Sequence, residues 1–553
     1  MSKGGWELIK KEIIILKKNA MLLDCTLRDG AYLVDKKFGD EIIHGIVTGL
    51  VKAKIDFIEI GFLQNDGFGE GKTVFKNSQD AKRYIPVDKN GCEFTVLADY
   101  SRYSVDNLDE CKGDSIDAVR ECFFKHERFD AMEACRKIKE RGYKLFVQPV
   151  DILGYTDKEL IEFIEMVNTL EPYCLSIVDT FGSMFQEDLH RVFELINHNL
   201  ISTCKIGFHS HNNMQLSNAL SQEFIRMTVG KRQTVIDGTI NGMGRGAGNT
   251  PTELIVQYMN AKLGYSYDID ALLDIIDSYM DTIKARCSWG YNIPYFLAGC
   301  FSAHVNNITY LLKKNSIRSK DIRFILNDLD TNTRKRYDYD MLEQKYVDLL
   351  SSDIEDDAVI EQLKEMLSDK RVLVVAPGRT TKTMQKEIQR VIEEKKLAVV
   401  SVNFLDKELR SDYVFVSNLR RLQMLEKNQE FLKIPKISTS NISADLAEND
   451  FRVSFLRLIK CGWEHLDNSS LMLLRLLDLL EVKEVYIAGF DGYDYTGRGR
   501  LNYASESLEL SSVNENPTSL NQEIMEMLDD FKQNKKNSNI YFVTPSRFEK
   551  CFE

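Results

Sequence analysis

The sequence of 553 residues lacks the features that mark several special classes of protein. It has no basic excess, because 72 Lys and Arg stand against 84 Asp and Glu, and the net charge of −12 argues against a general nucleic-acid binder. No apolar run is long enough to cross a bilayer. The N-terminal segment, mixed in charge with a short apolar patch, lacks the hydrophobic core and cleavage site of a signal peptide. We therefore expect neither nucleic acid nor a membrane as a partner.

The cysteines lack the pattern of a disulfide framework. Eleven are scattered along the chain, their number is odd, and no two form a Cys-x-x-Cys pair. This usage indicates free thiols in a reducing compartment, so we expect a cytoplasmic protein. Cysteines within strand-like runs, such as Cys25 and Cys174, are expected to be buried as small hydrophobic side chains.

The first half of the chain alternates between apolar runs of strand length and amphipathic stretches. Helical spacing of apolar residues is found at 40–54, 157–168, 186–198 and 215–229. Strands that alternate with helices predict parallel βαβ units, and eight such units match a (β/α)8 TIM barrel. A doubly wound open sheet is the alternative. The eight predicted strands are 21–25, 57–62, 93–98, 118–123, 144–150, 174–179, 205–209 and 234–238.

A chain of this length predicts more than one domain. After the barrel the pattern turns helical, including one stretch at 295–313, and could pack on the barrel, form a lid or form a dimer surface. A second, Rossmann-like α/β domain then begins with a buried strand at 371–376, a Pro-Gly turn and a helix at 384–395, with more strands at 397–402, 413–417, 484–489 and 539–543. We expect a homodimer. The predicted divisions are 1–19 (N-terminal helix), 20–262 (TIM-barrel catalytic domain), 263–345 (helical extension), 346–370 (linker) and 371–553 (Rossmann-like domain).

Asp29, His209 and His211 form the strongest candidate site. Asp29 ends the first strand in the run Thr-Leu-Arg-Asp-Gly, and the two histidines end the seventh strand. Active sites of parallel barrels lie at the carboxyl ends of the strands. One carboxylate and two imidazoles suit Mg²⁺, Mn²⁺, Zn²⁺ or Fe²⁺. The competing interpretation is a set of polar residues on loops.

Weaker candidates stand at other strand exits. Glu59 lies in the second strand, Gln148 in the fifth, and Asp179 and Thr180 end the sixth. Each could equally be solvated at the strand end. A loop at 242–249 with four glycines, including Gly246, would let the backbone approach a ligand closely.

Four motifs in this order resemble the metal-dependent aldolase and acyltransferase barrels. They are Asp-x-Thr-Leu-Arg-Asp-Gly at 24–30, Ile-Glu-Ile-Gly-Phe at 58–62, His-Ser-His-Asn-Asn at 209–213 and the glycine-rich loop that ends in Gly-Asn at 248–249. That superfamily includes 4-hydroxy-2-oxovalerate aldolase, isopropylmalate and homocitrate synthases and hydroxymethylglutaryl-CoA lyase. The resemblance covers residues 20 to about 260 and is strongest to the 4-hydroxy-2-oxovalerate aldolase branch.

The resemblance implies a role for each matching residue. Asp29, His209 and His211 would bind a divalent metal, Mn²⁺ or Mg²⁺ rather than Zn²⁺, and Asn249 would complete or support its ligand shell. Arg28 would stabilise enolate charge. Glu59 would lie near the substrate or the path of proton transfer. Gln148, Thr180 and Gly246 are candidates for substrate binding. The implied chemistry is carbon–carbon cleavage or formation through the enolate of a 2-oxo acid such as pyruvate, with a carbonyl compound as the second substrate.

The sequence departs from that pattern at Tyr32. Ketovalerate aldolases carry histidine there as the proton-transfer group, and the synthases and the lyase usually carry glutamine two residues after Arg-Asp-Gly, where this chain also has Tyr32. An ordinary phenol has a pKa near 10, which makes Tyr32 a poor base near neutrality. His304 in the helical section is a second candidate, with a packed helix histidine as the competing interpretation. The missing glutamine favours an aldolase over an acyl-CoA carboligase of the isopropylmalate-synthase type.

The second domain lacks both the Gly-x-Gly-x-x-Gly and the Walker A patterns. Its run Val-Tyr-Ile-Ala-Gly-Phe-Asp-Gly-Tyr at 485–493 resembles a segment of bacterial sialyltransferase-like and related surface-polysaccharide proteins, over one strand and its exit. Asp491 in this run would be a ligand contact or a solvated turn residue. A sugar-nucleotide-related transferase or binding role for this domain is therefore a further alternative.

Overall fold

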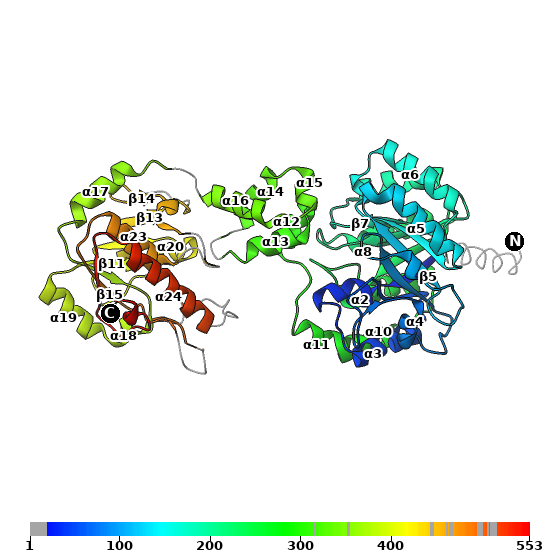
Figure 1. Cartoon of the computed structure of the whole chain (residues 1–553), viewed down its shortest axis with the longest axis horizontal. Helices are drawn as coiled ribbons and strands as arrows, with labels where there is room; N and C mark the ends of the chain where they lie inside the picture. The colour runs from blue at the N-terminus through cyan, green and yellow to red at the C-terminus, as the bar shows by residue number, and fades with distance from the viewer. Residues whose placement is uncertain are drawn as a thin grey trace, which may run out of the picture. The chain divides into compact units, whose positions relative to one another are not determined.

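Figure 1 shows a computed structural model of the whole chain, which divides into two compact units. One unit is Met1–Ile308 with Ile322–Tyr337, and the other is Thr309–Asp321 with Asp338–Glu553. This division falls within the predicted helical extension, and the predicted domain boundaries stay predictions. The structure describes residues 19–314, 317, 319–350, 354–442, 447–460, 463, 468–494, 502–505, 508 and 517–552.

The predicted helix at 1–19 lies outside the described residues except for Asn19. Across the described part of the chain, no helix combines the length and the apolar character that a bilayer span requires.

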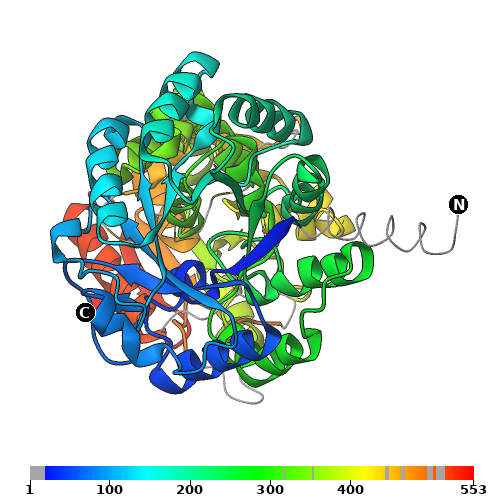
Figure 2. The same ribbon diagram turned by 90° about the vertical axis from the view of Figure 1, so that its right-hand side faces the viewer.

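The first unit contains a closed barrel of eight parallel strands, which confirms the predicted TIM barrel (Figure 2). The strands follow one another in sequence order around the barrel, and pairing of β1 with both β2 and β9 closes it. A short strand, β3 (Val74–Phe75), adds to the edge of β2. The barrel strands are β1 (Ala20–Asp24), β2 (Phe57–Leu63), β4 (Glu93–Asp99), β5 (Ala118–Phe123), β6 (Lys144–Pro149), β7 (Cys174–Asp179), β8 (Lys205–Ser210) and β9 (Thr234–Gly238).

Helices surround the barrel because each presents an apolar stripe to the strands. In α3, Ile43, Ile46, Val47 and Leu50 recur at helical spacing and are all buried. Helix α6 begins at a capping box, in which the side chains of Thr156 and Glu159 each accept a backbone N–H of the other. The main outer helices are α3 (Asp40–Ala53), α5 (Arg128–Glu140), α6 (Asp157–Leu170), α7 (Gln186–Asn199), α8 (Ser217–Thr228) and α9 (Thr252–Leu263).

The segment after the barrel is helical, but it is more broken than the sequence predicts. The stretch predicted at 295–313 is two helices, α12 (Ile293–Cys300) and α13 (Val305–Leu312). Between them Ser302 adopts φ of +48°, a left-handed conformation that ends α12. The other helices here are α10 (Ile269–Ile275), a π-helical turn (Ile276–Met280), α11 (Asp281–Lys284), α14 (Ser319–Asp328), α15 (Thr331–Lys335) and α16 (Tyr339–Leu350).

The second unit contains a sheet of seven parallel strands in the order β14-β13-β12-β11-β10-β15-β16. Its strands are β10 (Val372–Val375), β11 (Ala398–Val402), β12 (Tyr413–Val416), β13 (Lys436–Thr439), β14 (Phe451–Val453), β15 (Glu484–Ala488) and β16 (Asn539–Phe542). Its helices are α17 (Asp357–Leu367), α18 (Arg379–Thr383), α19 (Gln385–Lys395), α20 (Leu419–Leu425), α21 (Gln429–Lys433), α22 (Phe455–Leu458), α23 (Ser469–Leu479) and α24 (Pro517–Asn534). The strand order reverses between β10 and β15.

Candidate active site

The exit of β1 is a tight helical turn that holds two charged residues in place. In this turn, α2 (Thr26–Asp29), the backbone N–H of Asp29 donates to the carbonyl of Cys25 at 2.8 Å. The next residue is Gly30, and a Cβ at this position would lie 2.8 Å from the sulfur of Met243. A larger residue would therefore push the turn away from the loop after β9. Arg28 and Asp29 are therefore fixed at the barrel mouth, and both are buried.

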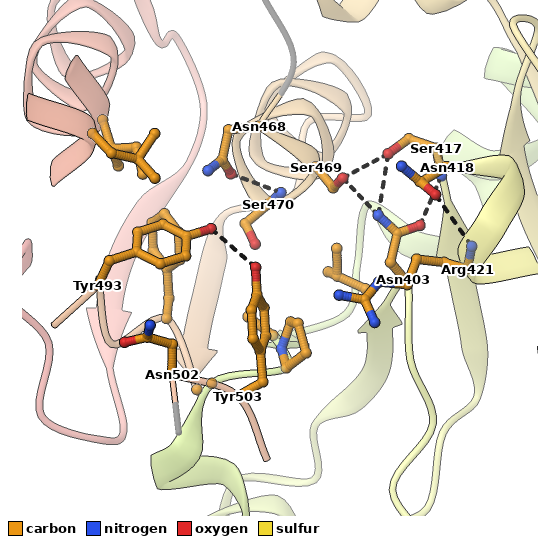
Figure 3. Close-up of a pocket in the computed structure, with 18 of the residues that line it drawn as sticks. Asn403, Ser417, Asn418, Arg421, Asn468, Ser469, Ser470, Tyr493, Asn502 and Tyr503 are labelled. Atoms are coloured by element: carbon orange, nitrogen blue, oxygen red, sulfur yellow. Dashed lines mark hydrogen bonds between the residues drawn. The ribbon is translucent and has the colours of Figure 1, made fainter. Parts of the chain in front are cut away.

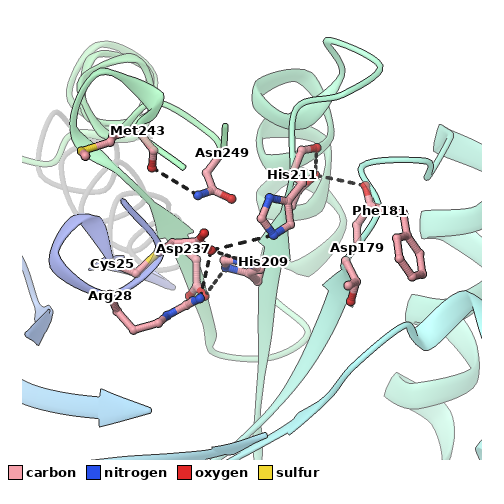
Figure 4. Close-up of polar contacts among 12 residues, drawn as sticks. Cys25, Arg28, Asp179, Phe181, His209, His211, Asp237, Met243 and Asn249 are labelled. Atoms are coloured by element: carbon pink, nitrogen blue, oxygen red, sulfur yellow. Dashed lines mark hydrogen bonds and ion pairs between the residues drawn. The ribbon is translucent and has the colours of Figure 1, made fainter. Parts of the chain in front are cut away.

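Asp29, His209 and His211 converge as the sequence predicts. Figure 4 shows the two histidines together with Arg28, Asp237 and Asn249. The Asp29 carboxylate lies 3.3 Å from Nε2 of His209 and 3.8 Å from Nε2 of His211. The two histidines are two residues apart at the end of β8, so their side chains share one face of the strand. One ligating atom from each of the three residues falls within 4.8 Å of the others, a spacing that one metal ion can bridge.

Two buried oxygen atoms give an independent reason to place a cation here. Oδ1 of Asp29 and Oδ1 of Asn249 have no hydrogen-bond partner within the described residues. Asn249 pairs with His211 across an isolated β-bridge, and its Nδ2 donates to the carbonyl of Met243 at 3.4 Å, which leaves Oδ1 as the free acceptor. Buried acceptors without donors are costly unless a cation or water satisfies them. The donor set therefore fits a divalent metal.

The charge states of Asp29 and His211 suit metal ligation, whereas His209 must release a proton to become a ligand. Burial would raise the pKa of Asp29, but Arg28 and the two histidines hold it well below its usual range. Burial lowers the pKa of His211 to about 4, so this ring is neutral near pH 7. His209 Nδ1 lies 2.9 Å from the carboxylate of Asp237, which orients the ring with Nε2 toward Asp29. Against its burial, the bonds to Asp237 and Asp29 raise the pKa of His209.

A chain of buried charges supports this site from below. Arg28 Nε donates to Glu59 at 2.7 Å and its Nη1 donates to Asp29 at 2.9 Å. Arg120 Nη1 donates to the same Glu59 oxygen at 3.1 Å, and its Nη2 donates to Asp237. Alternating cations and anions thus link the exits of β1 and β2 to β5 and β9, and through Asp237 to His209. Glu59 thus accepts a hydrogen bond from Arg28 and holds its guanidinium in position.

Sequence reasoning missed Arg120 and Asp237, although both are completely or almost completely buried. Each had one available signal, a charged residue inside an otherwise apolar strand, in the runs Ala-Val-Arg-Glu-Cys-Phe and Thr-Val-Ile-Asp-Gly. The same signal had identified Glu59. Only closure of the barrel brings these two side chains together across its interior.

Tyr32 lies under the guanidinium of Arg245, 3.7 Å from the centre of its ring. It also packs edge-on against Phe62, with 5.4 Å between the ring centres. Burial raises the pKa of the Tyr32 phenol, against the opposing effect of Arg245 and Arg28. The hydroxyl is therefore held in its protonated form, as a proton donor rather than a free base.

His304 lies in the turn before α13 rather than inside a helix. Its Nδ1 accepts the backbone N–H of Asn306 at 3.1 Å, and its ring packs on Tyr337 with 4.9 Å between centres. Burial, helped by the charge of Arg245, lowers the pKa of His304 to about 4. The ring is thus neutral near pH 7 and carries its proton on Nε2, which makes it a hydrogen-bond donor.

The three predicted substrate-binding residues differ in their surroundings. Gln148 is buried, and its Oε1 has no partner among the described side chains and backbone groups. The Thr180 hydroxyl accepts the backbone N–H of Asp151 at 2.8 Å, so it stabilises the loop after β6. At Gly246, with φ of +64°, a Cβ would lie 2.7 Å from Oδ1 of Asn213. Their contacts with a substrate stay predictions.

Comparison with known proteins identifies relatives of the barrel half of the chain. Residues 19–279 match the model of the HMGL-like family. The 4-hydroxy-2-oxovalerate aldolase of Carboxydothermus hydrogenoformans is 26% identical over 343 residues, which cover 57% of this chain and 94% of that protein. The oxaloacetate decarboxylase of Mycobacterium tuberculosis is 26% identical over 267 residues, 48% of this chain and 77% of that protein. The solved structure of HMG-CoA lyase from Bacillus subtilis superposes with a TM-score of 0.37 at 16% identity and covers 48% of this chain and 93% of that one.

Proposed function

Since residues 19–279 form an HMGL-like domain, we propose that the barrel is a divalent-metal-dependent carbon–carbon lyase of the aldolase class, acting on a 2-oxo acid through its enolate. The convergence of Asp29, His209 and His211 with two unsatisfied buried oxygens, beside Arg28, carries the proposal. The names of the two relatives support the substrate class, because oxaloacetate and 4-hydroxy-2-oxovalerate are both 2-oxo acids. We propose pyruvate as the 2-oxo acid.

Asp29, His209 and His211 would hold the metal, with the Oδ1 atom of Asn249 available as a further oxygen ligand. A bound Mg²⁺ or Mn²⁺ supplies Lewis-acid polarisation of the carboxylate and keto oxygens of a 2-oxo acid. Asp29 is ionised and His211 is neutral near pH 7, so these two ligands would bind a metal without releasing a proton. The pKa of His209 is raised, so metal binding there would release the proton of Nε2.

Arg28 would stabilise the negative charge that develops on the keto oxygen. Its contacts within the described residues use Nε and Nη1, which leaves the two N–H groups of Nη2 for a ligand. Glu59 and Asp29 fix the guanidinium in place, so no reorganisation is needed when the charge forms. Tyr32 and His304 would supply hydrogen-bond donors near the reacting oxygens, Tyr32 through its protonated hydroxyl and His304 through Nε2.

Two further expectations accompany this proposal. All ten cysteines among the described residues are unpaired, which supports a reducing compartment such as the cytoplasm. A homodimer stays a prediction from the sequence.

Deuterium exchange at the methyl group of pyruvate tests the enolate directly. The full chain is incubated with pyruvate in D₂O and Mg²⁺, and loss of the methyl proton signal is followed by NMR. We expect metal-dependent exchange that disappears in Asp29→Asn, because that variant loses the anionic metal ligand. Asp66→Asn, an exposed carboxylate in the loop after β2, is the matched control and should exchange like the wild type.

A parallel Mn²⁺ titration by electron paramagnetic resonance separates binding from chemistry. One bound Mn²⁺ that is lost in Asp29→Asn supports the proposed ligands. Exchange that persists in Asp29→Asn would exclude this site as its source. Bound metal without exchange, even after a range of 2-oxo acids and aldehydes is added, would exclude the enolate mechanism and favour an acyl-CoA condensation.

A further inference from the structure

The second unit contains a pocket at the place where a parallel sheet usually binds its ligand. The cavity, of about 620 Å³, lies at the carboxyl ends of the strands and is lined by residues that follow β10, β11, β12 and β15. The strand order reverses between β10 and β15, and the crevice at such a reversal is the common ligand site of open α/β sheets. Its volume suits a small organic molecule rather than an ion.

One anion position of such sheets is already filled by the protein itself. The helix after the first strand often presents free N–H groups to a phosphate. Here the helix is α18, and the Asp491 carboxylate from the exit of β15 accepts the backbone N–H of Thr380 at 2.8 Å and also accepts its hydroxyl. A second anion at this position would be repelled by Asp491. An anionic ligand must therefore be bound elsewhere in the pocket.

Arg421 supplies that other position. Its side chain lines the pocket with only 6% of the residue exposed. Nη2 donates to the carbonyl of Leu508 at 2.5 Å, but the buried Nη1 has no partner within the described ranges. The partner of Nη2 is a neutral carbonyl rather than a carboxylate. Burial lowers the pKa of the guanidinium, so its charge is poorly compensated. A buried cation with free donors is stabilised when an anion binds to it.

Apart from Arg420, Asp491 and Glu523, the rest of the wall is uncharged and includes many hydrogen-bonding groups (Figure 3). Asn403 and Ser417, at the exits of β11 and β12, share hydrogen bonds with Ser469 at the start of α23, including 2.7 Å between the two hydroxyls. The carboxylate side chains in the pocket lining are Asp491, already bound to Thr380, and Glu523. Amides and hydroxyls both donate and accept, as sugar hydroxyls and base edges require.

Two tyrosine rings, set at 74° to each other, lie next to the arginine. The rings of Tyr493 and Tyr503 lie 6.2 Å apart, with their hydroxyls at 3.3 Å, and Figure 3 shows both in the pocket wall. The guanidinium of Arg421 is 5.4 Å from the centre of the Tyr503 ring. Aromatic faces of this kind stack on planar bases.

From these observations we propose that the pocket binds a nucleoside phosphate, with the phosphate on Arg421 and the nucleoside along Tyr493, Tyr503 and the Asn403–Ser417–Ser469 network. The strand-reversal position and the cavity volume set the site and the size of the ligand, and the buried Nη1 of Arg421 favours an anion. The uncharged amides and hydroxyls and the tyrosine rings favour a polar, planar body over a lipid or an inorganic ion. This site lies within the second unit and does not depend on the barrel chemistry.

Isothermal titration calorimetry on the full chain tests the site with defined probes. The probes are AMP, GMP, CMP and UMP with their diphosphates, and ribose 5-phosphate and inorganic phosphate as comparison arms. We expect at least one nucleotide to bind, and Arg421→Met to weaken it at least about tenfold through loss of the charged hydrogen bond. Arg390→Met, an exposed arginine of α19 paired with Glu387, is the matched control and should bind like the wild type.

A second variant keeps the test valid if Arg421→Met fails to fold. Arg421→Lys retains the charge but not the forked geometry, and should fold and bind the nucleotide several-fold more weakly. Three results would overturn the proposal: no probe binds, the nucleotide binds both arginine variants as tightly as the wild type, or ribose 5-phosphate or inorganic phosphate binds as tightly as every nucleotide. Saturation-transfer NMR on the bound nucleotide, with its base protons nearest the protein, would confirm the tyrosine side of the site.

Discussion

The barrel and the second sheet both carry polar residues at the carboxyl ends of parallel strands, but they handle charge in opposite ways. In the barrel, two arginines and three carboxylates are buried together and bonded to one another, from Arg28 through Glu59 and Arg120 to Asp237. In the second sheet the corresponding positions hold amides and hydroxyls, and the buried guanidinium of Arg421 has no carboxylate partner within the described residues. At the barrel mouth the unpartnered atoms of Asp29 and Asn249 are acceptors, whereas in the second pocket the unpartnered atom of Arg421 is a donor.

This difference shows how the same edge of a parallel sheet can be adapted to ligands of opposite charge. In the barrel, the orphan oxygens of Asp29 and Asn249 are acceptors, so they select a metal ion. In the second sheet, the orphan group is a donor, Nη1 of Arg421. The sign of the missing partner, rather than the fold, distinguishes the two sites.

The largest expected effect is on catalysis in the barrel. His209→Ala removes a nitrogen ligand and leaves the Asp237 carboxylate without its imidazole, so turnover should fall at least about a thousandfold, or some 4 kcal/mol in the activation barrier. Pyruvate exchange and Mn²⁺ binding measured together check this. His198→Ala, a surface histidine of α7, should change neither. Full activity of His209→Ala would remove this histidine from the site.

The next largest effect is expected when the buried charge cluster of the barrel is broken, and it should appear in stability rather than in activity. Arg120→Met leaves Glu59 and Asp237 buried without their shared cation, and should lower the free energy of unfolding by about 3–5 kcal/mol. Urea denaturation of the barrel transition measures this. Arg136→Met, which breaks an exposed ion pair with Glu133, should cost less than about 1 kcal/mol. Equal losses in both variants would contradict the assignment of a tightly coupled buried cluster.

Asp24 is a buried carboxyl group whose hydrogen-bond partners are uncharged, and it should make the stability of the barrel depend on pH. Burial, only partly offset by hydrogen bonds from Thr252 and Thr26, raises the pKa of Asp24 from 3.8 to about 6. Between those pH values the folded protein keeps a proton that the unfolded chain releases, so rising pH should cost the fold about 3 kcal/mol. Asp24→Asn removes this loss. Its stability relative to the wild type should therefore increase by that amount from pH 4 to pH 7, as measured by urea denaturation, whereas Asp66→Asn should show no such trend.

The smallest expected effect lies in the neutral network of the second sheet. Ser417→Ala removes a hydroxyl that accepts from Asn403 and donates to Ser469, and should lower stability by about 1 kcal/mol because no charge is left uncompensated. Thermal unfolding of the second unit measures this, with the exposed Thr383→Ala as the control. A loss as large as that of Arg120→Met would show that neutral and charged networks do not differ as we infer.

Much of the fold is predictable from the sequence because its strands are long apolar runs with clear boundaries. All eight barrel strands were predicted in this way, and β5, β7 and β9 have the predicted limits. In the second sheet β13 and β14 were missed. They have four and three residues, and three of the four residues in the Lys436–Thr439 run are polar, so neither the length nor the apolar character of a buried strand is present.

The candidate site was less predictable, because side-chain partners depend on the closed barrel. Arg120 and Glu121 are adjacent charges in one strand, and the sequence treats them alike. In the structure Arg120 faces the interior and is bonded to two carboxylates, whereas both oxygens of Glu121 lack a partner among the described groups and burial raises its pKa well above the usual value. Thr180 illustrates the same point, since only the left-handed backbone of Asp151 brings that N–H to the threonine hydroxyl.

The path of the chain between the two compact units has a practical consequence. The chain passes from one unit to the other after Ile308, after Asp321 and again after Tyr337, so the units are interleaved in sequence rather than joined by one linker. A single proteolytic cut at any one of these crossings would leave a segment of one unit on the polypeptide that carries the other unit. A truncation at 346–370 would likewise separate Thr309–Asp321 from the unit to which it belongs. No single breakpoint therefore divides the chain into two polypeptides that each hold one whole unit.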